Sequence, residues 1–159
     1  MKRFLTYSVY FLFGVLMACS EAITPTPLTY TKVFTGDDHK SWSIKYFIFK
    51  QTGKGDQTFG LASCSGDDKY IFYAGLDRKY QIDNNSTTCS PDAGISYPLI
   101  DTWSFVNATA TLTIIIPELS DSALPFFVRS VNDKQMVLEI FVDQENTTSY
   151  QIYFTQNQN

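Results

Sequence analysis

The stretch from Cys64 to Cys89, CSGDDKYIFYAGLDRKYQIDNNSTTC, has the pattern of a β-hairpin with a cysteine just outside each end. The runs KYIFY and RKYQI are rich in aromatic and β-branched residues, as strands are. The turn AGLD between them contains Gly75, a residue that adopts positive φ without a steric cost. The rest of the chain is interpreted outward from this predicted hairpin.

One antiparallel register accounts for the apolar residues of the hairpin and for its cysteines. A slip of one residue would move the apolar face of a strand to the other side of the sheet, so the register is specified by that face. Closing a loop of this size with a disulfide would stabilise the fold by roughly 3 kcal/mol. Two free buried cysteines are the alternative that we consider less favoured. The expected partners are Tyr73 with Tyr80, Ile71 with Ile82, and Cys64 with Cys89.

The N-terminus has the features of an export signal. Three residues, Met1-Lys2-Arg3, are followed by an uncharged run over 4–17. This run is shorter than the roughly 20 apolar residues that span a membrane, but it suits the apolar region of a signal peptide. It ends in Leu16-Met17-Ala18-Cys19, which resembles the lipobox of bacterial lipoproteins. We therefore expect residues 1–18 to be a lipoprotein signal peptide.

The cysteine count agrees with lipidation of Cys19. The chain has three cysteines, and an ordinary cleaved signal would leave one unpaired in an oxidising compartment. A lipidated Cys19 leaves two cysteines for a bridge. The lipobox resemblance implies a diacylglycerol and usually a third acyl chain, and each buried CH₂ contributes about 0.8 kcal/mol. We expect a protein anchored by lipid in the bacterial cell envelope, at the outer membrane, with the leaflet left open.

The region after the anchor is predicted to be a tether. Pro25 and Pro27, interleaved with threonines, favour an extended segment over 19–35. The folded domain is then expected over 36–157, about 120 residues, which is enough for one hydrophobic core. The net charge of −4 and the lack of any Lys/Arg cluster argue against a nucleic-acid partner, because phosphate binding requires a cationic face.

The domain is predicted to be all-β. SWSIKYFIF alternates, with Trp42, Ile44, Tyr46 and Ile48 on one face. No stretch after Cys19 combines helical periodicity with capping residues. Short strands with tight turns between them indicate a sandwich or a barrel. The later strand candidates are TWSFV and TATLTIIIP around Asn107-Ala108, PFFVRSV and KQMVLEIFV around Asn132-Asp133, and TSYQIYFT, with Tyr150, Ile152 and Phe154 on one face.

Several motifs in order favour the barrel. They are Gly36 six residues before Trp42, Cys-x-x-Asp-Asp at 64–68 leading into the aromatic hairpin, Trp-x-Phe at 103–105, and Thr-Leu-Thr-Ile at 111–114. This order resembles the lipocalin-like lipoproteins common in Bacteroides-type bacteria, over roughly 36–156. The resemblance implies an antiparallel up-and-down barrel or half-barrel of about eight strands.

Four aromatic residues are the candidates for ligand binding: Trp42, Tyr73, Tyr80 and Trp103. They could line a cavity or form a carbohydrate platform. The competing interpretation is that they fill the barrel, as side chains do in small barrels, and we favour it for Trp42 and Trp103. Tyr97, near a predicted loop, is a further candidate contact residue.

The residue types needed for common catalytic sites are scarce. His39 is the only histidine, and one histidine does not make a typical zinc site. Asp37-Asp38 lies outside any calcium-loop pattern, and so does Asp67-Asp68. We interpret Asp67 and Asp68 as loop polarity that protects a sheet edge. No G-x-S-x-G or H-E-x-x-H motif is present. We therefore expect no enzyme activity, no metal and no cofactor.

Three functional hypotheses follow. The leading one is a lipid-anchored binding or interaction module whose ligand is a small apolar molecule, a glycan or an envelope protein. The second is a structural or accessory envelope subunit whose barrel is filled. The third is a hydrolase based on loop carboxylates. An open apolar cavity favours the first hypothesis over the second, and two converging carboxylates with raised pKa would favour the third.

Overall fold

The computed structural model describes residues 30–87 and 96–157. The predicted signal peptide, Cys19 and Cys89 lie outside these residues. The described chain forms a short helix, ten strands and a 3₁₀ turn. Their bounds are α2 (Tyr30–Thr35), β1 (His39–Gln51), β2 (Gln57–Gly60), β3 (Lys69–Tyr73), β4 (Lys79–Asp83), β5 (Leu99–Thr102), β6 (Ser104–Val106), η2 (Asn107–Thr109), β7 (Thr111–Ile116), β8 (Ser120–Val131), β9 (Gln135–Phe141) and β10 (Thr148–Gln156).

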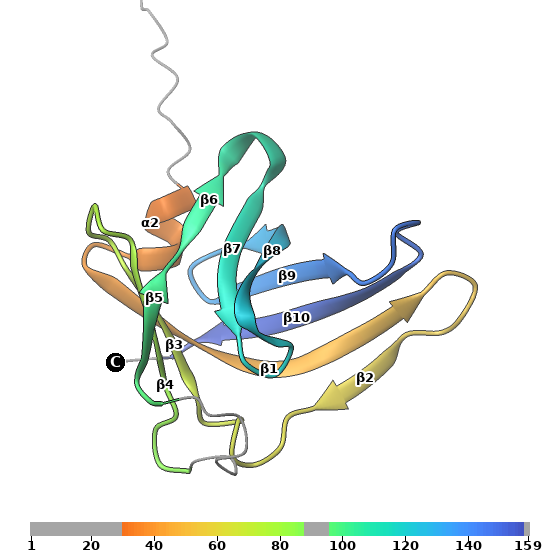
Figure 1. The fold of residues 1–159 in the computed structure, drawn as a ribbon, viewed down its shortest axis with the longest axis horizontal. Helices are drawn as coiled ribbons and strands as arrows, with labels where there is room; N and C mark the ends of the chain where they lie inside the picture. The colour runs from red at the N-terminus through yellow and green to blue at the C-terminus, as the bar shows by residue number, and fades with distance from the viewer. Residues whose placement is uncertain (1–29, 88–95, 158–159) are drawn as a thin grey trace, which may run out of the picture.

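All ten strands belong to one antiparallel sheet (Figure 1). Nine of them follow the order β5-β4-β3-β1-β10-β9-β8-β7-β6, and β2 adds to the outer half of β1. The result is a nearly closed barrel, which confirms the all-β antiparallel barrel predicted from the sequence. Long-range pairing of β1 with β10 joins the start of the domain to its end.

The two edges of the sheet are consecutive in the chain. Only Trp103 separates β5 from β6, so one extended segment pairs with β4 through its first half and with β7 through its second. The Trp103 backbone N–H donates to the carbonyl of Arg78 at 2.9 Å, and its indole N–H donates to the carbonyl of Tyr73 at 3.2 Å. Trp103 is only 1% exposed, so it fixes the seam of the barrel from the inside.

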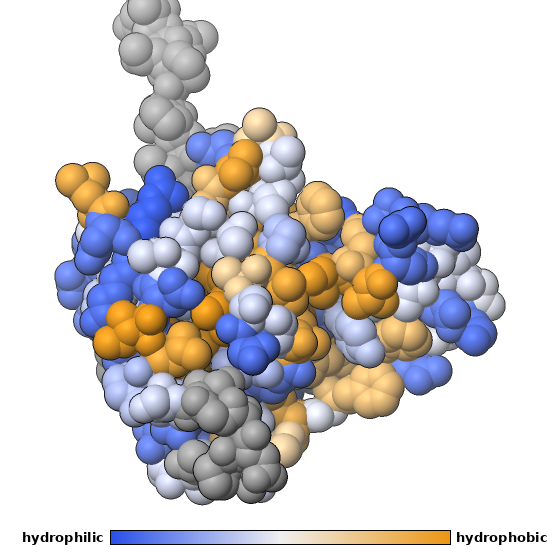
Figure 2. All heavy atoms as spheres, viewed as in Figure 1, coloured by the Kyte–Doolittle hydropathy of each residue, from blue (hydrophilic) through white to orange (hydrophobic). Residues whose placement is uncertain are grey.

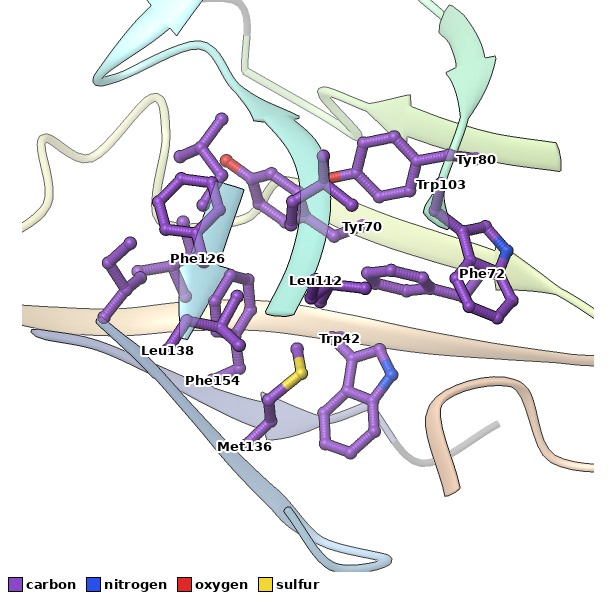
Figure 3. Close-up of a cluster of buried hydrophobic side chains, with 14 of the residues drawn as sticks. Trp42, Tyr70, Phe72, Tyr80, Trp103, Leu112, Phe126, Met136, Leu138 and Phe154 are labelled. Carbon is purple, nitrogen blue, oxygen red and sulfur yellow. The ribbon is translucent and has the colours of Figure 1, made fainter. Parts of the chain in front are cut away.

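The interior of the barrel is filled by side chains (Figure 3). Aromatic rings from neighbouring strands pack against one another: Phe72 on β3 lies 4.9 Å from Tyr80 on β4 and 6.0 Å from Trp103 between ring centroids. Burying each large apolar side chain contributes about 1.5–3 kcal/mol. The fully buried large residues are Trp42, Ile44, Tyr70, Phe72, Tyr80, Ile82, Trp103, Leu112, Ile114, Phe126 and Phe154, together with Phe34 from α2.

Helix α2 closes one end of the barrel. Phe34 is fully buried, and its ring lies 5.2 Å from that of Phe105. The indole N–H of Trp42 donates to the Phe34 carbonyl at 3.0 Å. The expectation of an extended tether over 19–35 is therefore wrong for 30–35. Six residues are too few to show helical periodicity, and the helix is held by tertiary contacts rather than by its own propensity.

A β-bulge corrects the predicted face of β1. The register with β10 shifts between Ile44 and Tyr46. Before the shift Trp42 and Ile44 are buried; after it Tyr46 is 36% exposed and Phe47 is buried. The predicted single face from Trp42 to Ile48 is therefore wrong beyond Ile44. A bulge inserts one residue and reverses the inside–outside phase of all that follow, which simple alternation cannot anticipate.

The register of the β3–β4 hairpin also differs from the prediction. Phe72 faces Tyr80 and Tyr70 faces Ile82, so Ile71 and Tyr73 leave the apolar face that we expected. The Arg78 N–H donates to the Gly75 carbonyl at 3.0 Å, and Arg78 adopts positive φ (48°). This left-handed residue lengthens the loop by one position and reverses the face of β3. The hairpin register therefore no longer supports pairing of Cys64 with Cys89.

We expect Phe34→Ala to lower the free energy of unfolding by about 3 kcal/mol or more, because it opens a cavity under α2. Urea unfolding followed by tryptophan fluorescence measures this. Lys32→Ala on the same helix is the matched control, since Lys32 is exposed and its surface ion pair with Asp37 contributes little. Equal stability of the two variants would show that α2 is not part of the folded unit.

Candidate functional site

An apolar groove of about 480 Å³ lies at the end of the barrel opposite α2. Strands β1, β2, β8, β9 and β10 each contribute one apolar residue to it. Two residues from turns complete the apolar lining. Glu118 is its acidic member. We call this the mouth groove; its apolar lining is Phe47, Phe59, Leu124, Ile140 and Tyr150, with Leu119 and Val142.

The β1 bulge is what creates the floor of the mouth groove. It turns Phe47 to the inner side of the sheet, where Phe47 faces Phe59 of β2 across the ladder. Phe59 remains 48% exposed because nothing among the described residues covers it fully. Figure 2 shows apolar side chains gathered on this face between the β7–β8 hairpin and the outer parts of the long strands. The concave sheet therefore continues past the filled core and presents an uncovered apolar surface.

Glu118 sits in the tight turn between β7 and β8, where the Leu119 N–H donates to the Ile116 carbonyl at 2.9 Å. The residue as a whole is exposed, but its carboxylate turns inward and accepts a hydrogen bond from the buried Tyr70 hydroxyl at 2.8 Å. Burial of this carboxylate raises the pKa of Glu118 above its ordinary value, and the Tyr70 bond partly opposes that shift.

Asp68 is a second acidic residue, and it interacts electrostatically with Glu118. It is 5% exposed, and its Oδ1 atom has no hydrogen-bond partner among the described residues. Burial raises the pKa of Asp68 to about 7, and the charges of Glu118 and Asp67 add to that increase. We call Asp68 and Glu118 the acid pair. Near neutral pH the acid pair holds a proton that an exposed pair would release.

The surroundings of the acid pair are phenolic rather than cationic. The Tyr80 hydroxyl donates to the Ile115 carbonyl at 2.9 Å. Burial raises the pKa of Tyr97, and both carboxylates of the acid pair raise it further. None of the ion pairs formed by the described residues includes Asp68 or Glu118. A positive charge that would neutralise the acid pair is therefore missing from the part of the chain that the structure describes.

The four predicted ligand-binding residues do not line the mouth groove. Trp42, Tyr80 and Trp103 are at most 1% exposed and belong to the core. This agrees with the core-filling interpretation of Trp42 and Trp103. Tyr73 is half-buried, with the Lys79 ammonium 4.5 Å from its ring centroid. The groove residues were missed because the β1 bulge hides the inward phase of Phe47.

Asp68 also departs from its sequence interpretation, whereas Asp67 agrees with it. Asp67 is half-buried at the sheet end and accepts bonds from the Ser86 and Thr87 hydroxyls at 2.6 and 2.8 Å. These bonds lower the pKa of Asp67 to about 2. Asp68 is a buried residue and not a polar surface residue. It lies two residues before the inward-facing Tyr70, so the two side chains share one face of the strand. The two-residue spacing between Asp68 and an inward-facing aromatic residue is the sequence signal for a buried carboxylate.

The remaining predicted positions have no arrangement typical of catalysis. His39 is exposed, and its Nδ1 atom lies 2.7 Å from the Asp38 carboxylate. The described residues contain no group of three or more His, Cys, Asp or Glu that could hold a metal ion. Cys64 is half-buried and disulfide-bonded. Because Cys19 and Cys89 both lie outside the described residues, the Cys64–Cys89 pairing stays a prediction.

No helix within 30–87 or 96–157 is long and apolar enough to cross a membrane. No protein-family model matches the chain, and no curated protein matches it significantly in sequence.

We expect Asp68→Asn to change how stability depends on pH. With a folded-state pKa near 7, Asp68 keeps a proton between about pH 4 and 7 that the unfolded chain releases. Wild-type stability should therefore fall as pH rises through that range, by on the order of 1 kcal/mol or more, and level off above pH 7. Asp68→Asn should flatten this fall in urea unfolding at pH 5 and pH 8.

Asp67→Asn is the matched control for this measurement. Its folded-state pKa is lowered, so its contribution is present above about pH 4 and is lost as pH falls toward 2. The charge of Asp67 is the smallest of the three causes of the raised Asp68 pKa, so Asp67→Asn should keep most of the wild-type difference between pH 5 and pH 8. An Asp68→Asn protein with the full wild-type pH slope would contradict the buried, proton-holding state of Asp68.

Proposed function

We propose that this protein is a lipid-anchored cell-envelope binding protein that takes an apolar ligand in the mouth groove. The observation that carries the proposal is the groove itself: an open apolar concavity with the Glu118 carboxylate in its lining. Ligand sites typically have volumes of roughly 300–1,000 Å³, an apolar lining and a few polar groups that orient the ligand. The groove has these properties at about 480 Å³.

The filled interior determines where binding takes place. A lipocalin-like protein with an open calyx would hold its ligand among the inward-facing residues. Here those positions are occupied by packed rings such as Phe72, Tyr80 and Phe126, all fully buried. The proposal therefore moves the ligand from the barrel interior to its mouth, where Phe59 is 48% exposed. An apolar ligand would remove that surface from water at about 25 cal/mol per Å².

Lipidation of Cys19 remains part of the proposal. Its support is the basic start, the uncharged run and the lipobox-like Leu16–Cys19. Residues 20–29 would join the anchor to α2, and ten residues reach at most about 35 Å when extended. Because α2 and the mouth groove lie at opposite ends of the barrel, this attachment would direct the groove away from the membrane.

The Cys64–Cys89 bridge is also retained, on evidence other than the hairpin register. Ser86 and Thr87 donate to the carboxylate of Asp67, so the chain three residues after Cys64 lies beside the chain two residues before Cys89. These bonds bring the two ends of the hairpin within reach of each other. With Cys19 assigned to the lipid, Cys89 is the cysteine left as the partner of Cys64.

The second candidate function is a structural or accessory envelope subunit. The filled core favours it, because an accessory subunit has no need of an internal cavity. It differs from the binding proposal in what it expects of the mouth groove: an accessory subunit would show no affinity for small apolar molecules. The binding test below therefore separates the two candidates.

A hydrolase is the weakest candidate. The acid pair supplies two interacting carboxylates with raised pKa, which is a feature of acid–base sites. A glycosidase, however, needs both carboxylates beside the bond to be cleaved. Only Glu118 of the acid pair lines the mouth groove, so a glycosidic bond has no place between the two carboxylates, whereas a compact head group would reach Asp68 once the Glu118 side chain moves aside. We therefore assign the acid pair to binding and propose that the protein is not an enzyme.

We expect Phe59→Ser to weaken binding of the neutral apolar dye Nile red by about tenfold. Losing the burial of one aromatic side chain corresponds to about 1.5–3 kcal/mol, and 1.4 kcal/mol is tenfold in affinity. Fluorescence titration measures the affinity. Phe127→Ser is the matched control, since Phe127 is 41% exposed but faces Glu139 on the outer side of the sheet. The absence of dye binding to the wild type would contradict the binding proposal and favour the accessory subunit.

We expect Cys19→Ala to release the protein from the membrane fraction, because it removes the site of acylation. Carbonate washing followed by immunoblotting measures the distribution, and Cys64→Ala is the control that changes a cysteine without touching the anchor. A Cys19→Ala protein that stays in the washed membrane pellet would contradict lipid anchoring at this residue.

A further inference from the structure

We propose that the ligand of the mouth groove carries a positively charged N–H head group, which Asp68 and Glu118 bind, on an apolar chain that the groove covers. This inference rests on the proposed binding function and adds the chemical class of the ligand. The class is an alkyl-ammonium amphiphile rather than a fatty acid or an uncharged lipid.

The first argument is the unsatisfied atom. Buried polar atoms in folded proteins are nearly always hydrogen-bonded, and each exception requires an explanation. The Oδ1 atom of Asp68 is buried without a partner, although Asp68 is 5% exposed. A donor supplied by a ligand would satisfy it, and a charged donor forms the stronger bond to a carboxylate.

The second argument is charge. The titratable groups that interact with the acid pair lie on three neighbouring segments: Asp67 and Tyr70 before and on β3, Tyr80 on β4 and Tyr97 before β5. All are acidic or phenolic. No Lys or Arg among the described residues forms an ion pair with either member of the acid pair. Two interacting carboxyl groups that have no cation as a partner favour a cationic ligand over an anionic one.

The third argument is position. Glu118 lines the mouth groove, and its carboxylate accepts the Tyr70 hydroxyl bond at 2.8 Å; Asp68 lies two residues before Tyr70 on the same buried face. A chain lying against Phe47, Phe59 and Leu124 would therefore end at the acid pair. Glu118 is an exposed residue of the β7–β8 turn, and its side chain would move off the Tyr70 hydroxyl to admit a head group.

Binding and protonation are linked in a direction that can be tested. Near pH 7 the acid pair holds a proton, whereas a bound ammonium favours the ionised carboxylates. An ammonium ligand should therefore release protons when it binds near neutral pH. Its affinity should rise as pH rises from 6 to 8, since Asp68 has a pKa of about 7. An uncharged ligand should show neither effect.

The experiment compares three ligands that share one chain: octylammonium, 1-octanol and octanoate. The protein is the mature chain with Cys19→Ala, which keeps every described residue and avoids detergent. Isothermal titration calorimetry at pH 8 should give at least tenfold tighter binding of octylammonium than of 1-octanol, and weaker binding of octanoate than of either. Titrations at pH 7 in phosphate and in Tris, whose ionisation enthalpies differ, should reveal proton release for octylammonium alone.

Two variants locate the head group. Asp68→Asn and Glu118→Gln should each lower the affinity for octylammonium about tenfold and leave 1-octanol binding unchanged. Glu145→Gln, an exposed acid in the turn before β10, is the control and should leave the affinities for both ligands unchanged.

The outcomes separate this inference from the proposed function. Equal binding of all three ligands, or unchanged octylammonium affinity in both acid-pair variants, would overturn the head-group assignment while leaving the groove as an apolar site. Tightest binding of octanoate would also overturn it and would indicate that the protonated acid pair receives a carboxylate. If Nile red and all three ligands fail to bind, the proposed function fails and this inference fails with it.

Discussion

Closure of the sheet at Trp103 is the constraint on which the rest of the structure depends. β5 and β6 are the two edge strands of the sheet. Because only this residue separates them in the chain, the two edges are held next to each other. The buried indole, bonded to the Tyr73 carbonyl, sits where the two edges meet. A barrel drawn together in this way is narrow, and small barrels are filled by side chains. The filled interior then leaves only the mouth for a ligand.

The mouth groove and the acid pair both follow from the way strands extend beyond that closed region. β1 continues past its bulge and presents Phe47 to the inner side, with β2 and β10 beside it. Asp68 enters the same end because it is in phase with Tyr70, and the β7–β8 turn brings Glu118 to it. Burial raises the pKa of both carboxylates. The structure thus combines an uncovered apolar surface with two carboxyl groups that lack a cationic partner. One amphiphilic ligand with a cationic head group would cover the surface and pair with the carboxyl groups.

The sequence was sufficient for the fold class and insufficient for the site, for identifiable physical reasons. Alternating aromatic and aliphatic residues predict strands, and the pair Ile152 and Phe154 was placed correctly because β10 is regular where they lie. Position-dependent features were missed where one residue is added: the bulge after Ile44 and the left-handed Arg78 each reverse the phase of a strand. Asp68 was assigned to the surface because an aspartate near a turn is usually exposed, and only the β3 register shows that it faces inward.

We propose that the ligand occupies the mouth groove and not the interior of the barrel. Isotope-filtered NMR on the protein with bound octylammonium tests it most directly, because nuclear Overhauser effects between ligand and protein methyl groups report contacts within about 5 Å. We expect effects from the octyl chain to Leu124 and Ile140 and none to Leu112 or Met136, which are fully buried in the core. Effects to Leu112 and Met136 would show that the core opens to form a calyx and would contradict the account.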